Sequence, residues 1–128
     1  MAKDTLDLTS EAPISFDAQV DIPTPDGNAK RITITYKWRD RIQMAALLDS
    51  YLAAARNKEP AAERPLAEVV KATIESDVEA IFDVATGWKL GADFDAQNLR
   101  KLCTRYPGAA SAILDHYRDA LTRGRLGN

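Results

Sequence analysis

Two side chains in this sequence, Cys103 and His116, are of the types that form nucleophilic catalytic pairs. A thiol becomes a good nucleophile when a neighbouring base accepts its proton. Both lie in segments of helical periodicity on either side of Pro107, where a turn would bring two antiparallel helices together. The thiol shares an apolar stripe with Leu99, Leu102 and Tyr106. We therefore expect Cys103 to be buried and unreactive, and His116, the single histidine, to lie at the surface or the rim of the core.

Acidic side chains gather on one predicted helix, where Asp77, Glu79 and Asp83 are closely spaced. Apolar positions flank Asp77 on the helix surface, so we expect a partly buried structural carboxylate that is capped or paired. One histidine and one cysteine are too few for a zinc site. The sequence contains no GxxxxGK[ST], GxGxxG or HExxH pattern. We accordingly predict no catalytic residue, no metal and no cofactor, and a protein that is not an enzyme.

The bulk composition is that of an ordinary globular domain. The chain has 128 residues, of which 45% are hydrophobic and 28% charged, enough for a core without disulfides. A net charge of −2 and a pI near 5.4 give no bulk attraction to nucleic acid or anionic membranes. The lone cysteine suits a reducing compartment, and neither an export signal nor a membrane span is visible. We expect a cytoplasmic protein without nucleic-acid or membrane partners.

Two stretches of alternating apolar and polar residues predict a β-hairpin over about residues 14–38. Between them, residues 23–28 are rich in turn formers. Only a loop of odd length places both apolar sets on one face of the hairpin. Such a loop is either a three-residue turn with Asn28 in the left-handed region or a five-residue turn. The expected pairs are Ile22–Ile32, Val20–Ile34 and Phe16–Trp38.

The remainder of the chain has the periodicity of amphipathic helices. Four helices are expected, over about residues 40–57, 65–86, 95–106 and 107–123. Asp95 is the expected N-cap of the third, and a left-handed Gly87 the expected end of the second. An isolated hairpin is marginal in water, so its apolar face must be covered. We therefore predict an α+β fold, with a flexible arm over 1–13 and a single domain over 14–128 in which the hairpin packs on the helices.

Apolar surfaces are the remaining candidates for function. A strand edge can pair with another chain, and a helical groove can accept an apolar helix. Trp38, beside two arginines, fits a core position and the rim of a partner groove equally well, whereas Trp88 fits a core position better. The candidate partner-binding residues lie on the hairpin face and the first helix: Phe16, Val20, Ile34, Tyr36, Trp38, Met44, Leu48 and Tyr51.

Three short motifs follow one another in the second half of the chain. They are Gly87-Trp88-x-Leu90, Asp95-x-x-Asn98-Leu99 and Tyr106-Pro107-x-Ala109-x-x-Ala112-Ile113-x-x-x-Tyr117. In this order and spacing they resemble the tail assembly chaperones of phages and prophages with long non-contractile tails. The alternating strands before a long helix fit the same pattern. The resemblance covers about residues 14–128, although 55–65 match nothing in it.

The resemblance implies an interaction role in phage tail assembly. Chaperones of this family bind the long, helical, aggregation-prone tape measure protein, keep it soluble and help to recruit tail tube protein. Several members self-associate, and all leave before the virion is finished. Three alternatives are a structural tail or connector subunit retained in the virion, a small cysteine-dependent enzyme, and a DNA-binding regulator. The pI and the absence of a basic helix face disfavour the last of these.

Overall fold

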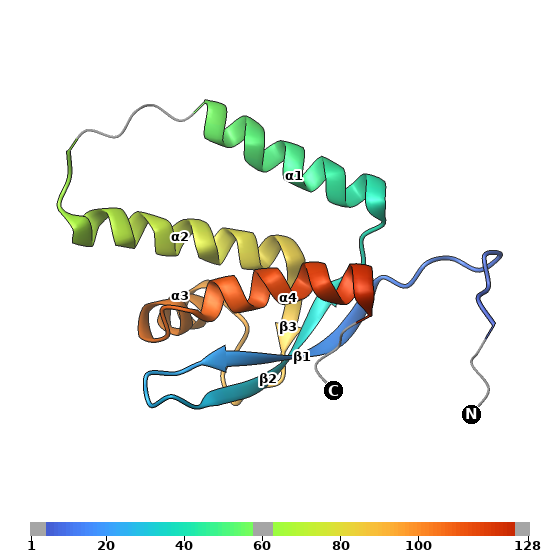
Figure 1. The fold of residues 1–128 in the computed structure, drawn as a ribbon, viewed down its shortest axis with the longest axis horizontal. Helices are drawn as coiled ribbons and strands as arrows, with labels where there is room; N and C mark the ends of the chain where they lie inside the picture. Colours follow the sequence, from blue (N-terminus) through green and yellow to red (C-terminus); the bar gives the residue numbers. More distant parts are fainter. Residues whose placement is uncertain (1–4, 58–62, 125–128) are drawn as a thin grey trace.

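The structure, a computed structural model, describes residues 5–57 and 63–124. Its elements in chain order are β1 (Ser15–Pro23), β2 (Ala29–Lys37), α1 (Arg41–Arg56), α2 (Leu66–Val84), β3 (Ala85–Trp88), α3 (Ala96–Arg105) and α4 (Ala109–Arg123). The strands form one antiparallel sheet in the order β1-β2-β3. In Figure 1, α2, α3 and α4 lie against the sheet, whereas α1 stands apart from it, across α2. The predicted α+β class is confirmed.

The apolar residues of the two hairpin strands share one face, as predicted, but the residue pairs across the strands differ from those expected. Val20 lies opposite Ile32, two residues away from the expected partner Ile34, and Phe16 lies opposite Tyr36 rather than Trp38. Because the displacement is an even number, both apolar sets still share one face.

The turn accounts for the displaced pairing. The loop covers residues 24–28, so it is odd in length as predicted, but it is centred on Asp26. The Asp26 carboxylate accepts the Asn28 amide proton at 3.0 Å and is also bound by the Thr24 hydroxyl. The left-handed residue is Gly27, with φ of 85°, rather than Asn28. Side-chain bonds to Asp26 therefore set the turn, and hydrophobic alternation could not reveal them.

The third strand was not predicted. Residues 85–88 were expected to continue α2 or to leave it at a left-handed glycine, but they pair with β2, with Ile34 opposite Trp88. Gly87 does not have a positive φ. Four residues are too few to show a period, so a strand this short is recognisable only from its neighbour.

The helices begin near the expected residues. The Asp40 carboxylate accepts the Gln43 amide proton, and the Gln43 side chain returns a bond to the Asp40 amide, which completes a capping box. Asp95 caps α3 through the Asn98 amide at 2.8 Å, as predicted. The helix ending at Gly124 takes a left-handed cap there, with φ of 63°.

The core lies between the sheet and three of the four helices. Its fully buried large side chains come from β1, β2, α2, α3 and α4 and are Val20, Ile34, Tyr36, Ile81, Leu99, Ile113 and Tyr117. Helix α1 joins the other three helices only through Met44 and Leu47, which are partly buried and pack against the core, and none of its residues is fully buried. Residues 5–14 are exposed and carry no helix or strand. Their flexibility stays a prediction, and the arm's residues 1–4 and the chain end 125–128 lie outside the described residues.

Two buried tyrosines join the hairpin to α4. The Tyr36 hydroxyl on β2 donates to the Ile113 carbonyl of α4 at 2.7 Å, and the Tyr117 hydroxyl on α4 donates to the Lys37 carbonyl of β2 at 2.9 Å. Their ring centroids are 5.0 Å apart. The Arg39 guanidinium adds a third bond, donated to the Tyr117 hydroxyl at 3.1 Å. Each element therefore supplies a donor to the backbone of the other.

Asp77 lies at the edge of this core on α2 and is half-buried. Desolvation by burial raises the pKa of its carboxyl above the ordinary value. Among the hydrogen bonds and ion pairs of residues 5–57 and 63–124, none satisfies this carboxylate, so the expected cap or ion pair is not present. The ionised form of Asp77 is therefore less favourable in the folded chain than in the unfolded one.

Removing the hydroxyl of Tyr117 should destabilise the fold. Tyr117→Phe leaves the Lys37 carbonyl and the Arg39 guanidinium without their partner, so we expect a loss of about 1–3 kcal/mol in the free energy of unfolding. Urea denaturation followed by circular dichroism measures this loss. Tyr51→Phe, which removes an exposed hydroxyl bond, is the matched control and should cost clearly less. Equal losses in the two variants would contradict the role given to Tyr117.

Replacing Asp77 should stabilise the protein at neutral pH. The folded state raises the pKa of this carboxyl, so its ionisation disfavours folding above that pKa, and the penalty disappears as the pH falls through it. Asp77→Asn should raise the thermal midpoint at neutral pH, and the gain should shrink on acidification. Glu79→Gln, at an exposed position of the same helix, should give no such gain. A pH-independent effect of Asp77→Asn would rule out desolvation as its cause.

Candidate functional site

Helix α1 is weakly attached to the rest of the molecule. None of its 16 residues, all of which the structure describes, is buried. Met44 and Leu47 are partly buried and pack against the core from the first half of the helix. Most helical stability in proteins comes from packing of an apolar face, and an isolated helix of this length is marginal in water. We therefore regard α1 as an element that lacks part of its packing partner.

One polar contact holds the middle of α1 to the end of α2. The Tyr51 hydroxyl donates to the Asp83 carboxylate at 2.8 Å. Burial and this bond together raise the pKa of Tyr51 to about 12. The contact joins α1 to α2, and the two helices run alongside each other in Figure 1.

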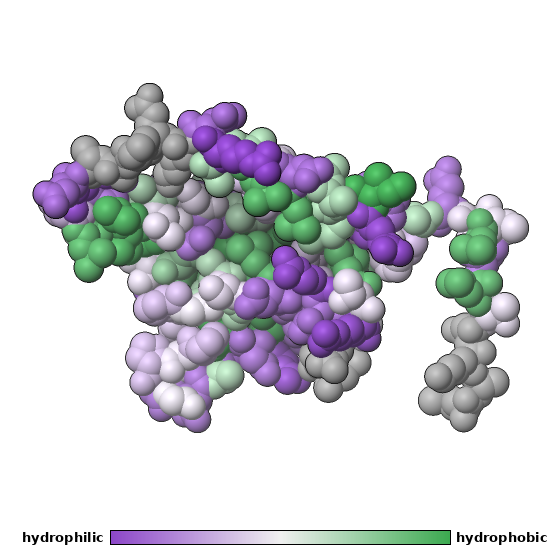
Figure 2. Space-filling view, turned by 45° about the horizontal axis from the view of Figure 1, so that its top comes forward, coloured by the Kyte–Doolittle hydropathy of each residue, from purple (hydrophilic) through white to green (hydrophobic). Residues whose placement is uncertain are grey.

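Apolar side chains remain exposed on both of these helices. We call this surface the α1–α2 apolar face. Its members, with their exposed fractions, are Leu48 39%, Tyr51 39%, Leu52 54%, Leu66 77%, Val69 39% and Val70 46%. Figure 2 shows apolar surface along the inner side of α1 and at the beginning of α2. Soluble monomers rarely leave clustered apolar side chains of this kind uncovered unless the surface binds a partner.

The structure does not bring the eight predicted partner-binding residues to one surface. Three of them, Val20, Ile34 and Tyr36, are at most 2% exposed and belong to the core. Phe16 and Met44 are partly buried. The remaining three are exposed, with Leu48 and Tyr51 on α1 and Trp38 42% exposed at the end of the hairpin.

The sequence reasoning missed the contribution of α2 to this surface. Leu66, Val69 and Val70 belong to the apolar stripe of α2, and the candidate residues drawn from the sequence included none from that helix. In the structure, the buried residues of α2 are Val78, Ile81 and Val84, in its second half. A helical stripe shows which side of a helix is apolar, but not how far the neighbouring element extends along it.

The candidate nucleophile pair is not assembled. Cys103 is 7% exposed, and burial raises the pKa of its thiol to about 11, so it is protonated at neutral pH. The negative charge of Asp77 on α2 also raises this pKa, by less than burial does. His116 instead lies against the Tyr36 ring, with 6.2 Å between ring centroids, and its buried Nδ1 has no hydrogen-bond partner within the described part of the chain. Both predictions are confirmed: the Cys103 thiol is buried, and His116 lies at the rim of the core.

No other chemistry is assembled among residues 5–57 and 63–124. No group of three His, Cys, Asp or Glu side chains in that part of the chain is placed to hold a metal ion. None of the helices described there is long and apolar enough to cross a membrane. Trp88, expected in the core, is partly buried and donates its indole N–H to the Ala92 carbonyl at 2.8 Å.

Comparison with known proteins identifies the family. The family model for phage tail assembly chaperone matches residues 1–128, which is the whole chain. No curated protein and no solved structure gave a match. The resemblance seen in the Trp88–Tyr117 motifs is thereby confirmed, and a chaperone family points to a non-enzymatic role among tail proteins inside the host cell. An exposed apolar face and a buried, protonated thiol are consistent with that role, and the chain belongs to the phage tail assembly chaperone family.

Proposed function

We propose that this protein binds the tape measure protein and keeps it soluble until the tail tube forms around it. The observation that carries the proposal is the α1–α2 apolar face, which lies outside the core and on which six large apolar side chains are at least 39% exposed. A long helical partner with apolar stripes would aggregate through those stripes. Covering them requires an apolar surface on the chaperone and no reactive side chain.

The binding mode that fits this face is an amphipathic helix laid between α1 and α2. The partner helix would contact Leu48 and Tyr51 towards one end and Val69 and Val70 towards the other, because Tyr51 bonds to Asp83 at the far end of α2 from Val69. Burying such side chains contributes about 25 cal/mol for each Å² of apolar surface removed from water. It would also give α1 the packing that its own fold does not supply.

The contact is expected to be reversible. Part of the free energy gained by burying apolar surface is offset by the entropy lost when α1 and the partner become ordered, so one copy binds weakly. Many copies along one long helix still hold it, because each weak contact is reinforced by its neighbours on the same polymer. Recruitment of the tail tube protein would then displace them one at a time. We place this activity in the host cytoplasm, and Phe16, Trp38 and Met44 stay secondary candidates for partner contact.

A substitution on the face should abolish the protective effect. Leu48→Asp introduces a charge where the partner helix would lie, and a buried unpaired charge at a binding hot spot costs about 2 kcal/mol or more, which is roughly thirtyfold in affinity. We expect Leu48→Asp to lose the increase in soluble tape measure protein that the wild-type chain produces on co-expression. Soluble and pelleted fractions measured by gel densitometry provide the readout.

Ile42→Asp is the matched control for that experiment. Ile42 lies on the same helix, is 82% exposed and projects about 120° around the helix axis from Leu48. It should leave the soluble yield unchanged, and circular dichroism should show that both variants fold. If the wild-type chain itself fails to raise the yield, the proposal is wrong. If mass spectrometry finds the chain in purified particles, the alternative of a retained structural subunit replaces it.

A further inference from the structure

A second apolar surface lies at the far end of the hairpin. A hollow of about 250 Å³ opens there between the strands and the end of α4. It is lined by Phe16, Trp38, Ala120, Leu121 and Gly124, and we call it the hairpin-end pocket. Trp38 is 42% exposed beside it and contacts Phe16 edge-on, with ring centroids 5.9 Å apart. This pocket is separate from the α1–α2 apolar face.

The N-terminal arm begins at the edge of this pocket. The Trp38 amide donates to the Ile14 carbonyl at 2.9 Å, so the arm leaves the body beside the indole ring. Figure 1 shows the arm projecting away from the sheet and helices. It carries two of the most exposed apolar side chains of the described residues, Leu6 at 82% and Leu8 at 87%. Two leucines on a tether are thus held close to an apolar hollow.

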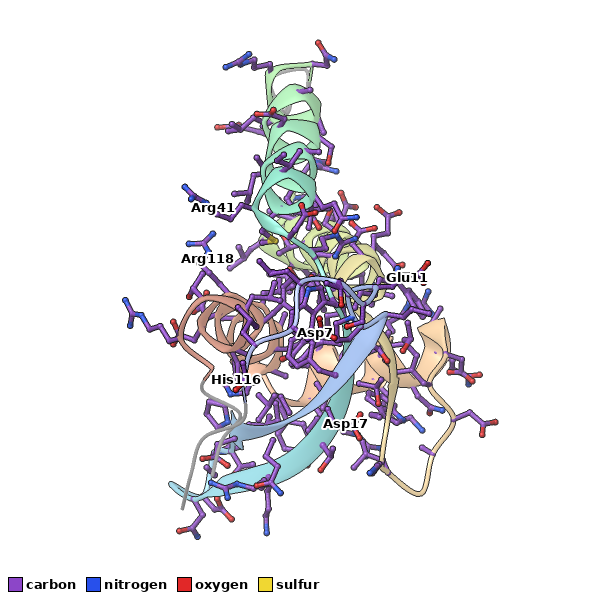
Figure 3. The ribbon with its side chains drawn as sticks, turned by 90° about the vertical axis from the view of Figure 1, so that its right-hand side faces the viewer. Asp7, Glu11, Asp17, Arg41, His116 and Arg118 are labelled. Atoms are coloured by element: carbon purple, nitrogen blue, oxygen red, sulfur yellow. The ribbon has the colours of Figure 1, made fainter. Side chains whose placement is uncertain are left out.

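The charges of the arm and the pocket rim are opposite. Asp7 and Glu11 make residues 5–13 acidic. Arg39 follows the pocket residue Trp38 in β2's extension, and its guanidinium donates to the hydroxyl of Tyr117, which lies one helical turn before Leu121. Arg118 and Arg123 flank the pocket-lining positions of α4, and Arg123 also faces Asp119 at 3.9 Å. In Figure 3, Arg118 projects from α4 to the same side as Arg41, whereas Asp7 and Glu11 lie along the arm.

We propose that the arm is an intramolecular strap that folds back and places Leu8, with Leu6 beside it, in the hairpin-end pocket of its own chain. The geometry allows this, because six residues between Leu8 and the sheet span up to about 20 Å, and the pocket adjoins the arm's base. The Asp7 carboxylate already bends the arm locally, accepting the Thr9 amide at 2.8 Å and the Ser10 hydroxyl at 3.0 Å. That turn presents Leu6 and Leu8 on either side of the charge.

The tether favours the chain's own arm over other occupants. A short flexible link holds its end at an effective concentration of about millimolar, which exceeds that of a second copy in dilute solution. The strap keeps Trp38, Leu6 and Leu8 covered while the α1–α2 apolar face stays available. This inference does not depend on the identity of the partner bound at that face.

Fluorescence of Trp38 tests the strap. In a Trp88→Phe background Trp38 is the single tryptophan, and acrylamide quenching reports its exposure. We expect removal of residues 2–13 to raise the quenching constant about twofold, and Leu6→Ser with Leu8→Ser to reproduce that rise. Leu66→Ser, which removes a leucine of similar exposure on α2, should leave the quenching constant unchanged. Identical quenching with and without the arm would overturn the strap.

A disulfide trap provides a second test that leaves Trp88 in place. Leu8→Cys combined with Leu121→Cys should oxidise to an internally bridged monomer, since the native Cys103 is buried. Leu8→Cys alone should give no bridged monomer. The strap is wrong if the paired variant gives disulfide-linked dimers instead, because the arm would then occupy the pocket of a second copy. Failure of tape measure binding would leave both results unchanged, so the two proposals fail separately.

Discussion

Two buried tyrosine hydroxyls constrain the relative position of the hairpin and α4, and much of the structure depends on how they are satisfied. A buried hydroxyl without an acceptor costs more than an ordinary hydrogen bond contributes. Tyr36 and Tyr117 avoid this cost because each reaches the backbone of the other's element. With β2 and α4 joined in this way, the apolar face of the sheet is covered, and α2 and α3 complete the core from the remaining side.

This arrangement determines where a partner can bind. Most of the apolar face of the sheet is buried inside the molecule, so its central residues are not available to another chain. Helix α1 is not needed to close the core and contributes no buried residue. The first half of α2 extends beyond the core and leaves its apolar stripe exposed. The molecule therefore combines a packed core with exposed apolar side chains on α1 and on the first half of α2, which is the surface that the proposed partner binding requires.

Several features could be predicted from the residues because their causes are local. The shared face of β1 and β2 follows from alternation and an odd loop, and the caps at Asp40 and Asp95 follow from side chains that reach the next turn. The exact strand pairing could not be predicted, since it depends on which atoms bind Asp26 in the turn. β3 could not be predicted either, because four residues become a strand only when β2 lies beside them.

The sequence alone determined which sides of its helices and strands are apolar, that its one thiol sits on an apolar stripe, and which family its motifs resemble. Periodicity and spacing along the chain are sufficient for those conclusions. Only the tertiary structure decided which apolar side chains are buried and which are left exposed. Val20 and Leu66 look equally suited to a core in the sequence, yet one is 2% exposed and the other 77%. The physical reason is that burial depends on the length and position of the neighbouring element, and the second half of α1 and the start of α2 extend past the other helices and strands of residues 5–57 and 63–124.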